Sequence, residues 1–302
     1  MIYWRLSGFY LFYFASLGAL LPYWSLYLES LDFSVTENGK MVALLLATKI
    51  VAPKIWGWIS DHTGHRMAII PSGSLLAAIT FAGVFIGDSF WWLALVMAVF
   101  SFFWNAALPQ FEATTMNHLG DDLHRYSGIR LWGSIGFIIA VSGLGALLGE
   151  SGTGLLPTVL MVLFVLIWLS SLTVPESAAG HLPLDQEPLR KVLSQPVVLS
   201  LLAVCFLAQA SHGPYYAFFS IYMQHHGYPT AVIGQLWALG VLAEIVIFLL
   251  TPLLLPRFGA RQLLISAIAL TTLRWLLTAL FADRLAIIIF SQTLHAASFG
   301  LY

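Results

Sequence analysis

The sequence contains ten long apolar segments, and these constrain its fold more than any other feature. A helix needs about 20 mostly apolar residues to cross the hydrocarbon core of a bilayer. Lipid cannot satisfy backbone polar groups, and the segments lack the short alternating pattern of a membrane barrel, so each segment predicts a helix. The segments cover approximately residues 6–29, 38–59, 67–87, 90–117, 128–149, 155–174, 197–222, 229–255, 262–282 and 285–302. The sequence therefore predicts an all-α integral membrane protein.

Composition supports this class. Hydrophobic residues make up 59% of the chain and charged residues only 9%, against about 25% charged residues in a soluble protein. The net charge of −1 provides no basic field for nucleic acid. The single cysteine, Cys205, excludes a disulfide framework and a multi-thiolate metal site. Without a phosphate-binding loop or another enzyme signature, we expect neither an enzyme nor a cofactor or metal.

A polar, proline-rich stretch over residues 175–196 separates six of the segments from the other four. We interpret it as a cytoplasmic linker between an N-terminal six-helix bundle (1–174) and a C-terminal bundle (197–302). The loops around Gly64 and Gly259 match at a distance of about 195 residues, and the first and seventh segments repeat at nearly the same distance. Two helix bundles related by a repeat are the architecture of transporters whose halves rock about a central site.

Basic residues predict the orientation of the chain, because cytoplasmic loops carry an excess of Lys and Arg. An N-terminus on the inner side leaves only Lys40 and Arg284 in the outer loops. The inner side then holds Arg5, Arg66, Arg125, Arg190, Lys191, Arg257 and Arg261. The sequence therefore predicts a multi-pass protein with a cytoplasmic N-terminus.

The loop between the second and third segments resembles the signature loop of the major facilitator superfamily. The residues that carry the resemblance are Gly57, Asp61, Gly64 and Arg66. In that family the glycines permit close packing and a tight turn, and the acid and the base latch the cytoplasmic helix ends in one state of the cycle. His62 and His65 stand where the family usually has Arg or Lys, and Pro256 takes the place of the acid in the second copy. The resemblance implies a cytoplasmic gating loop, and these departures predict that its latch is weak or sensitive to pH.

Three further stretches, residues 127–134, 212–222 and 236–244, resemble the phenylpropionate permease family, a relative of the lactose permease-type proton symporters. That resemblance implies twelve spans and proton-driven uptake through a bacterial cytoplasmic membrane. Members of the family take aromatic acids, and their relatives take oligosaccharides or nucleosides. The sequence ends at Tyr302, inside the tenth segment. We therefore expect a C-terminal bundle that lacks two of its helices.

Ionisable residues inside the apolar segments are the candidate functional residues. A charge at the bilayer centre costs at least about 2.5–3.5 kcal/mol, so such a residue must be paired, hydrated or useful. The N-terminal bundle holds Lys49, Glu112 and Arg130, and the C-terminal bundle holds His212, Glu244, Arg274 and His295. Each bundle thus contains residues that can carry a positive charge and residues that can carry a negative charge, as expected for a water-filled cavity between two halves.

Glu112 and Arg130 are the first choice for binding substrate, because a Glu and an Arg at the matching positions bind substrate in the sugar symporters. They flank a short loop, so they can face each other on adjacent helices. The alternative is an ion pair that holds two helices together. Further candidates for substrate binding, each of which also has a purely structural explanation, are Lys49, His212, Tyr215, Tyr216 and Trp237.

Glu244, Arg274 and His295 are the candidates for proton coupling. Arg274 and His295 match an Arg and a His of the lactose permease pattern. The acid expected three residues after the His is Ser298, and the base expected three before it is Gln292. Glu244 lies one helical turn beyond the relatives' acid, where this chain has Val241. Glu244 is therefore either a proton carrier or one member of a structural pair.

These observations predict a secondary active transporter that imports a small aromatic carboxylate, such as 3-phenylpropionate, with protons by alternating access. One alternative is proton symport of a sugar or a nucleoside. Another is a truncated membrane protein that does not transport. The expected partners are the small-molecule substrate, protons and the lipid bilayer, without nucleic acid, and the family resemblance implies a monomer.

Overall fold

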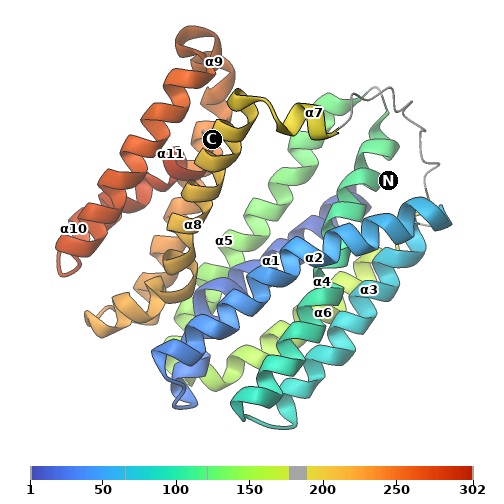
Figure 1. Ribbon diagram of the computed structural model, residues 1–302. Helices are drawn as coiled ribbons and strands as arrows, with labels where there is room; N and C mark the ends of the chain where they lie inside the picture. The colour runs from blue at the N-terminus through green and yellow to red at the C-terminus, as the bar shows by residue number, and fades with distance from the viewer. Residues whose placement is uncertain (1, 65, 121, 177–188, 301–302) are drawn as a thin grey trace. The chain divides into compact units, whose positions relative to one another are not determined.

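The structure is a computed structural model that describes residues 2–64, 66–120, 122–176 and 189–300, and all regular structure in these ranges is helical (Figure 1). The chain divides into two compact units. The first comprises Met1–Gly180 together with Pro229–Gly234, and the second comprises His181–Tyr228 and Gln235–Tyr302. Most of the predicted linker lies outside the described residues.

The first unit is a bundle of long helices. Its helices are α1 (Ile2–Ser30), α2 (Val35–Thr63), α3 (Arg66–Phe81), α4 (Phe90–Leu119), α5 (Tyr126–Ser151) and α6 (Leu156–Ser171). Short 3₁₀ turns cover Ala82–Phe85, Leu123–Arg125 and Thr153–Leu155. Helix α1 packs against α5 and α6, while α3 packs against α4 and α6, and α2 packs against α4.

Aromatic rings form much of the core of this bundle. The ring of Phe9 on α1 stacks on that of Phe111 on α4 with centroids 3.8 Å apart. Tyr13 stacks on Trp104 in the same way at 5.1 Å. Small residues let the backbones approach, because a Cβ added at Gly136 of α5 would collide with the Leu11 carbonyl of α1. The bundle is therefore held by close helix contacts around stacked rings.

The second unit contains α7 (Leu189–Leu193), α8 (Pro196–His225), α9 (Thr230–Leu280), α10 (Leu285–Thr293) and α11 (His295–Gly300). The first turn of α9 belongs to the first unit. Helix α7 falls inside the stretch predicted as a linker. The eighth and ninth segments form one helical run, which is interrupted at Gly259 (φ 74°, ψ 155°). This left-handed φ favours glycine, and it lies in the loop that the sequence predicts there.

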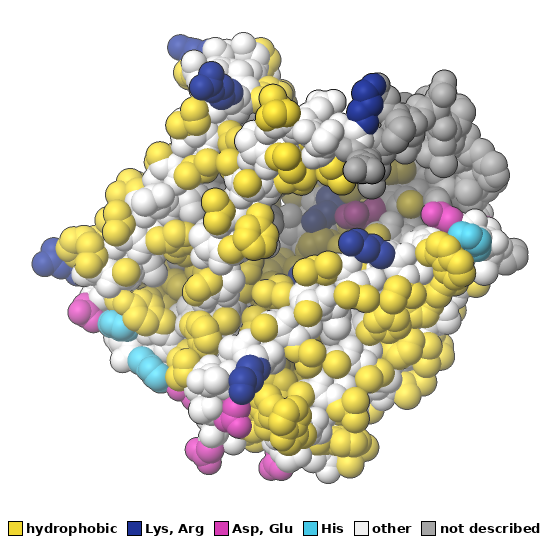
Figure 2. Space-filling model, viewed as in Figure 1, with side chains coloured by type: hydrophobic (Ala, Val, Ile, Leu, Met, Phe, Trp, Pro, Cys, Tyr) yellow, Lys and Arg dark blue, Asp and Glu magenta, His cyan; other side chains and the backbone are white. Residues whose placement is uncertain are grey.

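The tenth segment is divided into α10 and α11, with the break at Leu294. Eight of the described helices are long and apolar enough to cross a membrane, against the ten predicted segments, because the two halves of α9 count as one run and Leu285–Ser298 is too short. Large apolar side chains such as Ile50, Ile79 and Leu253 point outward. Figure 2 shows hydrophobic side chains spread over the visible surface, with few charged groups among them. This distribution is that of a protein embedded in lipid.

Candidate functional site

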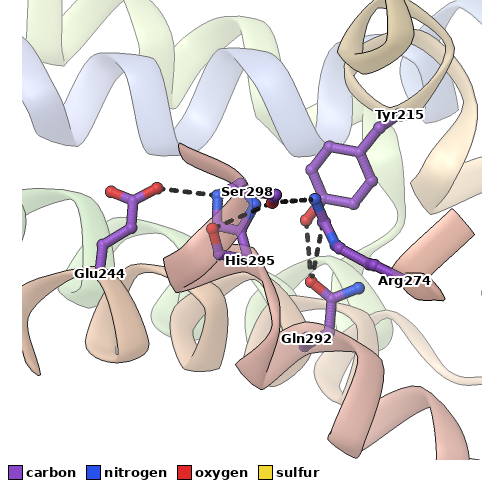
Figure 3. A network of polar contacts seen from close by, with 6 residues as sticks. All are labelled: Tyr215, Glu244, Arg274, Gln292, His295 and Ser298. Carbon is purple, nitrogen blue, oxygen red and sulfur yellow. Dashed lines mark hydrogen bonds and ion pairs between the residues drawn. The ribbon is translucent and has the colours of Figure 1, made fainter. Parts of the chain in front are cut away.

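Six side chains of the second unit form a polar network among its helices (Figure 3). They come from α8, both halves of α9, α10 and α11, and they are Tyr215, Glu244, Arg274, Gln292, His295 and Ser298. The interruption at Gly259 lets the two halves of α9 contribute one residue each, Glu244 and Arg274. The network therefore gathers all three residues predicted for proton coupling.

Glu244 and His295 form the shortest polar contact of this network. Glu244 Oε1 lies 2.8 Å from His295 Nε2, and the two side chains are only 15% and 7% exposed. Gly240, one turn before Glu244, makes room for the imidazole, since a Cβ added there would lie 3.0 Å from His295 Cδ2. This contact is compatible with both roles that the sequence leaves open for Glu244, a proton carrier and one member of a structural pair.

Arg274 is fully buried. Its Nη1 donates to Ser298 Oγ at 3.2 Å and its Nη2 to Gln292 Oε1 at 3.5 Å. The guanidinium lies 4.3 Å from the ring centroid of Tyr215 and 4.4 Å from that of Trp275. Among the described residues, no carboxylate lies within 4.0 Å of it. Arg274 therefore has neutral and aromatic partners where a buried cation normally has an acid.

Two buried N–H groups at this point have no hydrogen-bond acceptor among the described atoms. They are Nε of Arg274 and Nε2 of Gln292. The amide oxygen of Gln292 is already used, since it accepts from Tyr215 Oη at 3.0 Å as well as from Arg274. Buried polar groups normally have a partner, so each of these two donors could still bind an acceptor.

The aromatic candidates surround the same network. Tyr215 lies 4.6 Å from Trp237 between centroids, and Tyr216 stacks on Trp237 at 6.4 Å. Trp237 Nε1 donates to Ser220 Oγ at 3.0 Å. These rings bring a large apolar area and polar groups to the same part of the second unit.

His212 also belongs to this cluster, with its ring 5.1 Å from that of Trp275 and 6.3 Å from that of His295. Its Nδ1 lies 2.8 Å from the backbone carbonyl of Ala208. A carbonyl only accepts, so Nδ1 carries the proton in this contact. The structure thus brings four of the candidates for substrate binding together, namely His212, Tyr215, Tyr216 and Trp237.

The candidates of the first unit make fewer contacts than those of the second unit. The guanidinium of Arg130 lies 3.8 Å from the ring centroid of Phe14. Glu112 is half-buried, and no ion pair within 4.0 Å joins it to Arg130 in the part of the chain that is described. Lys49 is exposed on α2. The alternative of a close structural ion pair between Glu112 and Arg130 is therefore not what the structure contains.

The predicted gating loop contains the expected tight turn. Gly64 ends α2 with φ 70° and donates its N–H to the Ser60 carbonyl at 2.9 Å. Gly57 and the exposed Asp61 lie on the last turns of α2, while the side chain of Arg66 lies outside the described residues. His62 packs on Trp58 with a centroid distance of 4.2 Å, a contact that the loop motif does not predict.

Sequence reasoning missed part of the site. In the sequence, Gln292 and Ser298 stand out only as departures from a family pattern, yet both accept a hydrogen bond from Arg274. A signal was available, because Gln292, His295 and Ser298 are spaced three residues apart and so share one helix face. Trp275 was not singled out at all, since a tryptophan in an apolar segment is usually a packing residue.

Comparisons with known proteins agree with this architecture. The MFS_1 like family matches residues 3–302. The chain is 29% identical over 317 residues to a protein of Escherichia coli named "Probable 3-phenylpropionic acid transporter", covering 98% of the chain and 78% of the relative. It is 27% identical over 286 residues to the maltose permease of Geobacillus stearothermophilus, covering 89% of the chain and 68% of the relative.

Solved structures show the same fold. The nucleoside transporter NupG superimposes with a TM-score of 0.85 at 17% identity, covering 99% of this chain and 80% of that one. A D-xylose-proton symporter superimposes with a TM-score of 0.67 at 14% identity, covering 98% and 78%. The predicted major facilitator fold is therefore confirmed, and the relatives are transporters rather than enzymes. With its family match over nearly the whole sequence, this multi-pass membrane chain belongs to the MFS_1 like family of major facilitator transporters.

Proposed function

We propose that this chain imports a small aromatic carboxylate, such as 3-phenylpropionate, together with protons across a bacterial cytoplasmic membrane by alternating access. The observation that carries the proposal is the buried group of Glu244, His295 and Arg274 with aromatic rings around it. Ionisable residues inside a membrane-spanning bundle are costly and are therefore retained mainly where they serve transport. The relative named as a 3-phenylpropionic acid transporter supports the substrate class.

Proton coupling is assigned to the Glu244–His295 pair. A carboxylate and an imidazole in direct contact can take up one proton without a change in position, because the proton is shared between them. Arg274, as a permanent cation in the same network, makes the charge of the site depend on whether that proton is present. A symporter needs such a dependence, since proton and substrate must bind together.

Substrate binding is assigned to the aromatic wall and to the cations. Tyr215, Tyr216 and Trp237 offer ring faces that suit the phenyl group of the substrate. The planar fork of donors of an arginine suits a carboxylate. By family resemblance, Arg130, Glu112 and Lys49 are also assigned to substrate binding, each on the first unit.

The remaining assignments concern the cycle. We assign the loop of Gly57, Asp61, Gly64 and Arg66 to cytoplasmic gating, with the N-terminus on the same side. The tight turn at Gly64 supports this role, because it joins α2 closely to α3. The transporter is proposed to act as a monomer.

Uptake into proteoliposomes tests the proposal. Purified protein is reconstituted with an imposed inward proton gradient and offered 3-phenylpropionate, maltose, xylose and a nucleoside in parallel. We expect gradient-driven accumulation of the aromatic acid and none of the others. Protein-free liposomes measure passive entry of the protonated acid, and this background is subtracted.

Three outcomes would contradict the proposal. Accumulation of maltose, xylose or the nucleoside without the acid would favour the second candidate function, which the maltose permease and nucleoside transporter relatives support. Uptake that does not respond to the gradient would exclude proton coupling. Binding without uptake of any compound would show that this chain does not transport.

A further inference from the structure

The charge of the network in the second unit depends on one proton. Arg274 is always charged, whereas Glu244 and His295 exchange protons. The other titratable groups that face them come from α8 and are His212, Tyr215 and Tyr216. With an ionised Glu244 and neutral rings, the network carries no net charge. When the Glu244–His295 pair gains a proton, the network carries one positive charge.

Once the Glu244–His295 pair is protonated, the positive charge of Arg274 has no counter-ion in contact with it. The guanidinium contacts a hydroxyl, an amide oxygen and two aromatic rings, and no carboxylate of the described residues lies within 4.0 Å. A buried cation without an anion is strongly unfavourable. Protonation of the Glu244–His295 pair therefore favours the binding of an anion beside Arg274.

The geometry at Arg274 shows what kind of group would meet that demand. Nε of Arg274 and Nε2 of Gln292 are both buried donors without an acceptor. One of these donors belongs to the permanently charged guanidinium and the other to an amide that contacts it, and N–H donors of this kind suit the oxygens of a carboxylate. The rings of Tyr215 and Trp275, at 4.3 and 4.4 Å from the guanidinium, suit an aromatic body attached to it.

We propose that Arg274, with Gln292, binds the carboxylate of the transported substrate, and that this binding is tied to protonation of the Glu244–His295 pair. One proton then enters with each monocarboxylate, so the loaded site is neutral and transport moves no net charge. This inference rests on the proposed function and assigns its stoichiometry and its anion site. Arg274 thereby becomes a substrate ligand as well as a member of the coupling network.

Proton uptake on binding provides the first test. Titration calorimetry of the detergent-solubilised protein with 3-phenylpropionate, repeated in buffers of different ionisation enthalpy, counts the protons taken up. We expect about one proton per ligand bound for the native chain at neutral pH. Glu244→Gln mimics the protonated pair, so it should bind the acid without proton uptake. Binding by the native chain with no proton uptake would overturn the link to the pair.

Discrimination between an acid and its amide tests the role of Arg274. The native chain should bind 3-phenylpropionate more tightly than 3-phenylpropionamide by about tenfold or more, as expected for charge-assisted hydrogen bonds. Arg274→Gln should remove this preference, and Arg257→Gln, at an exposed arginine of α9, should keep it. A purely structural role would weaken both ligands equally and leave the preference intact, which would overturn the proposal.

Transport provides the third readout. In proteoliposomes with a fixed proton gradient, a potassium diffusion potential set with valinomycin should leave the rate of acid uptake unchanged. A rate that follows the potential would exclude one proton per carboxylate. If the chain takes up the acid and Arg274→Gln still prefers 3-phenylpropionate over 3-phenylpropionamide, this inference is wrong and the proposed function stands. Absence of any aromatic acid binding would overturn both.

Discussion

Glu244 on α9 reaches His295 on α11, with Oε1 and Nε2 2.8 Å apart. The acid lies one helical turn beyond Val241, the position where the family pattern has its acid, and it still meets the imidazole. The contact is possible because Gly240 leaves space beside the ring, as a Cβ there would come within 3.0 Å of His295 Cδ2. The acid and the imidazole can therefore form a pair from a shifted position in the sequence.

Replacing Glu244 with Gln should abolish accumulation of substrate against its gradient while sparing exchange. A glutamine keeps the shape and a hydrogen bond to His295 but cannot lose a proton. Accumulation under a proton gradient and counterflow without one are measured on the same proteoliposomes. The exposed Asp283→Asn serves as the control. Intact accumulation in Glu244→Gln would refute a role for Glu244 in coupling.

Gly240→Ala should reduce proton-driven uptake by displacing the imidazole of His295 from Glu244. The added methyl group would be 3.0 Å from His295 Cδ2 and 3.6 Å from Gln292 Oε1, so the neighbouring ring has to move. Gly213→Ala on α8 is the matched control, because nothing lies within 4 Å of its added Cβ. Uptake is compared at equal amounts of reconstituted protein. Equal loss in both variants would point to a general effect on the helices.

Ser298→Asp should weaken binding of an aromatic acid by about tenfold or more, since it places a carboxylate beside Arg274. Ser298 Oγ already lies 3.2 Å from Arg274 Nη1, so the new acid would become the counter-ion in place of the substrate. Ser298→Asn has nearly the same size without the charge and should bind more tightly than Ser298→Asp. The affinities of the two variants for 3-phenylpropionate are measured by calorimetry at one pH. Equal affinities of Ser298→Asp and Ser298→Asn would argue against an anion site.

Arg130→Gln tests the assignment of the first unit to substrate binding. The guanidinium lies on Phe14, and its removal should lower uptake at low substrate concentration if it contacts the substrate. Arg125→Gln is the control, because Arg125 is exposed. It pairs with the exposed Asp122, with 3.8 Å between Nη1 and Oδ2. The concentration dependence of uptake is measured for both. An unchanged half-saturation concentration in Arg130→Gln would remove Arg130 from the site.

Gly136→Ala should destabilise the first unit by about 1–3 kcal/mol, as overpacking of a tight contact does. Its added Cβ would collide with the backbone of Leu11, which is part of helix α1 and cannot rotate away. Gly143→Ala, on the same helix but with open space, should be neutral or slightly stabilising. Thermal unfolding in detergent compares the two. An unchanged midpoint for Gly136→Ala would show that α1 and α5 do not approach as closely as described.

Much of the fold could be predicted because membrane helices are defined locally. The segments that became α1, α2 and α4 are recognisable from their length and apolar content, since a bilayer requires about 20 such residues. The turn at Gly64 was predictable for the same local reason, as a left-handed residue at a helix end favours glycine. The division of the tenth segment at Leu294 was not, because no Pro or Gly marks it.

The candidate site, like the fold, was predictable from the sequence only in part. The sequence by itself determined which ionisable groups enter the apolar segments, because each segment's composition can be read along the chain. Only the tertiary structure decided their partners: Glu244 meets His295, Arg274 meets Ser298 and Gln292, and Arg130 lies on Phe14 rather than against Glu112. These pairings depend on how each helix is rotated and where α9 and α10 break, and such rotations arise from packing between segments that are distant in sequence.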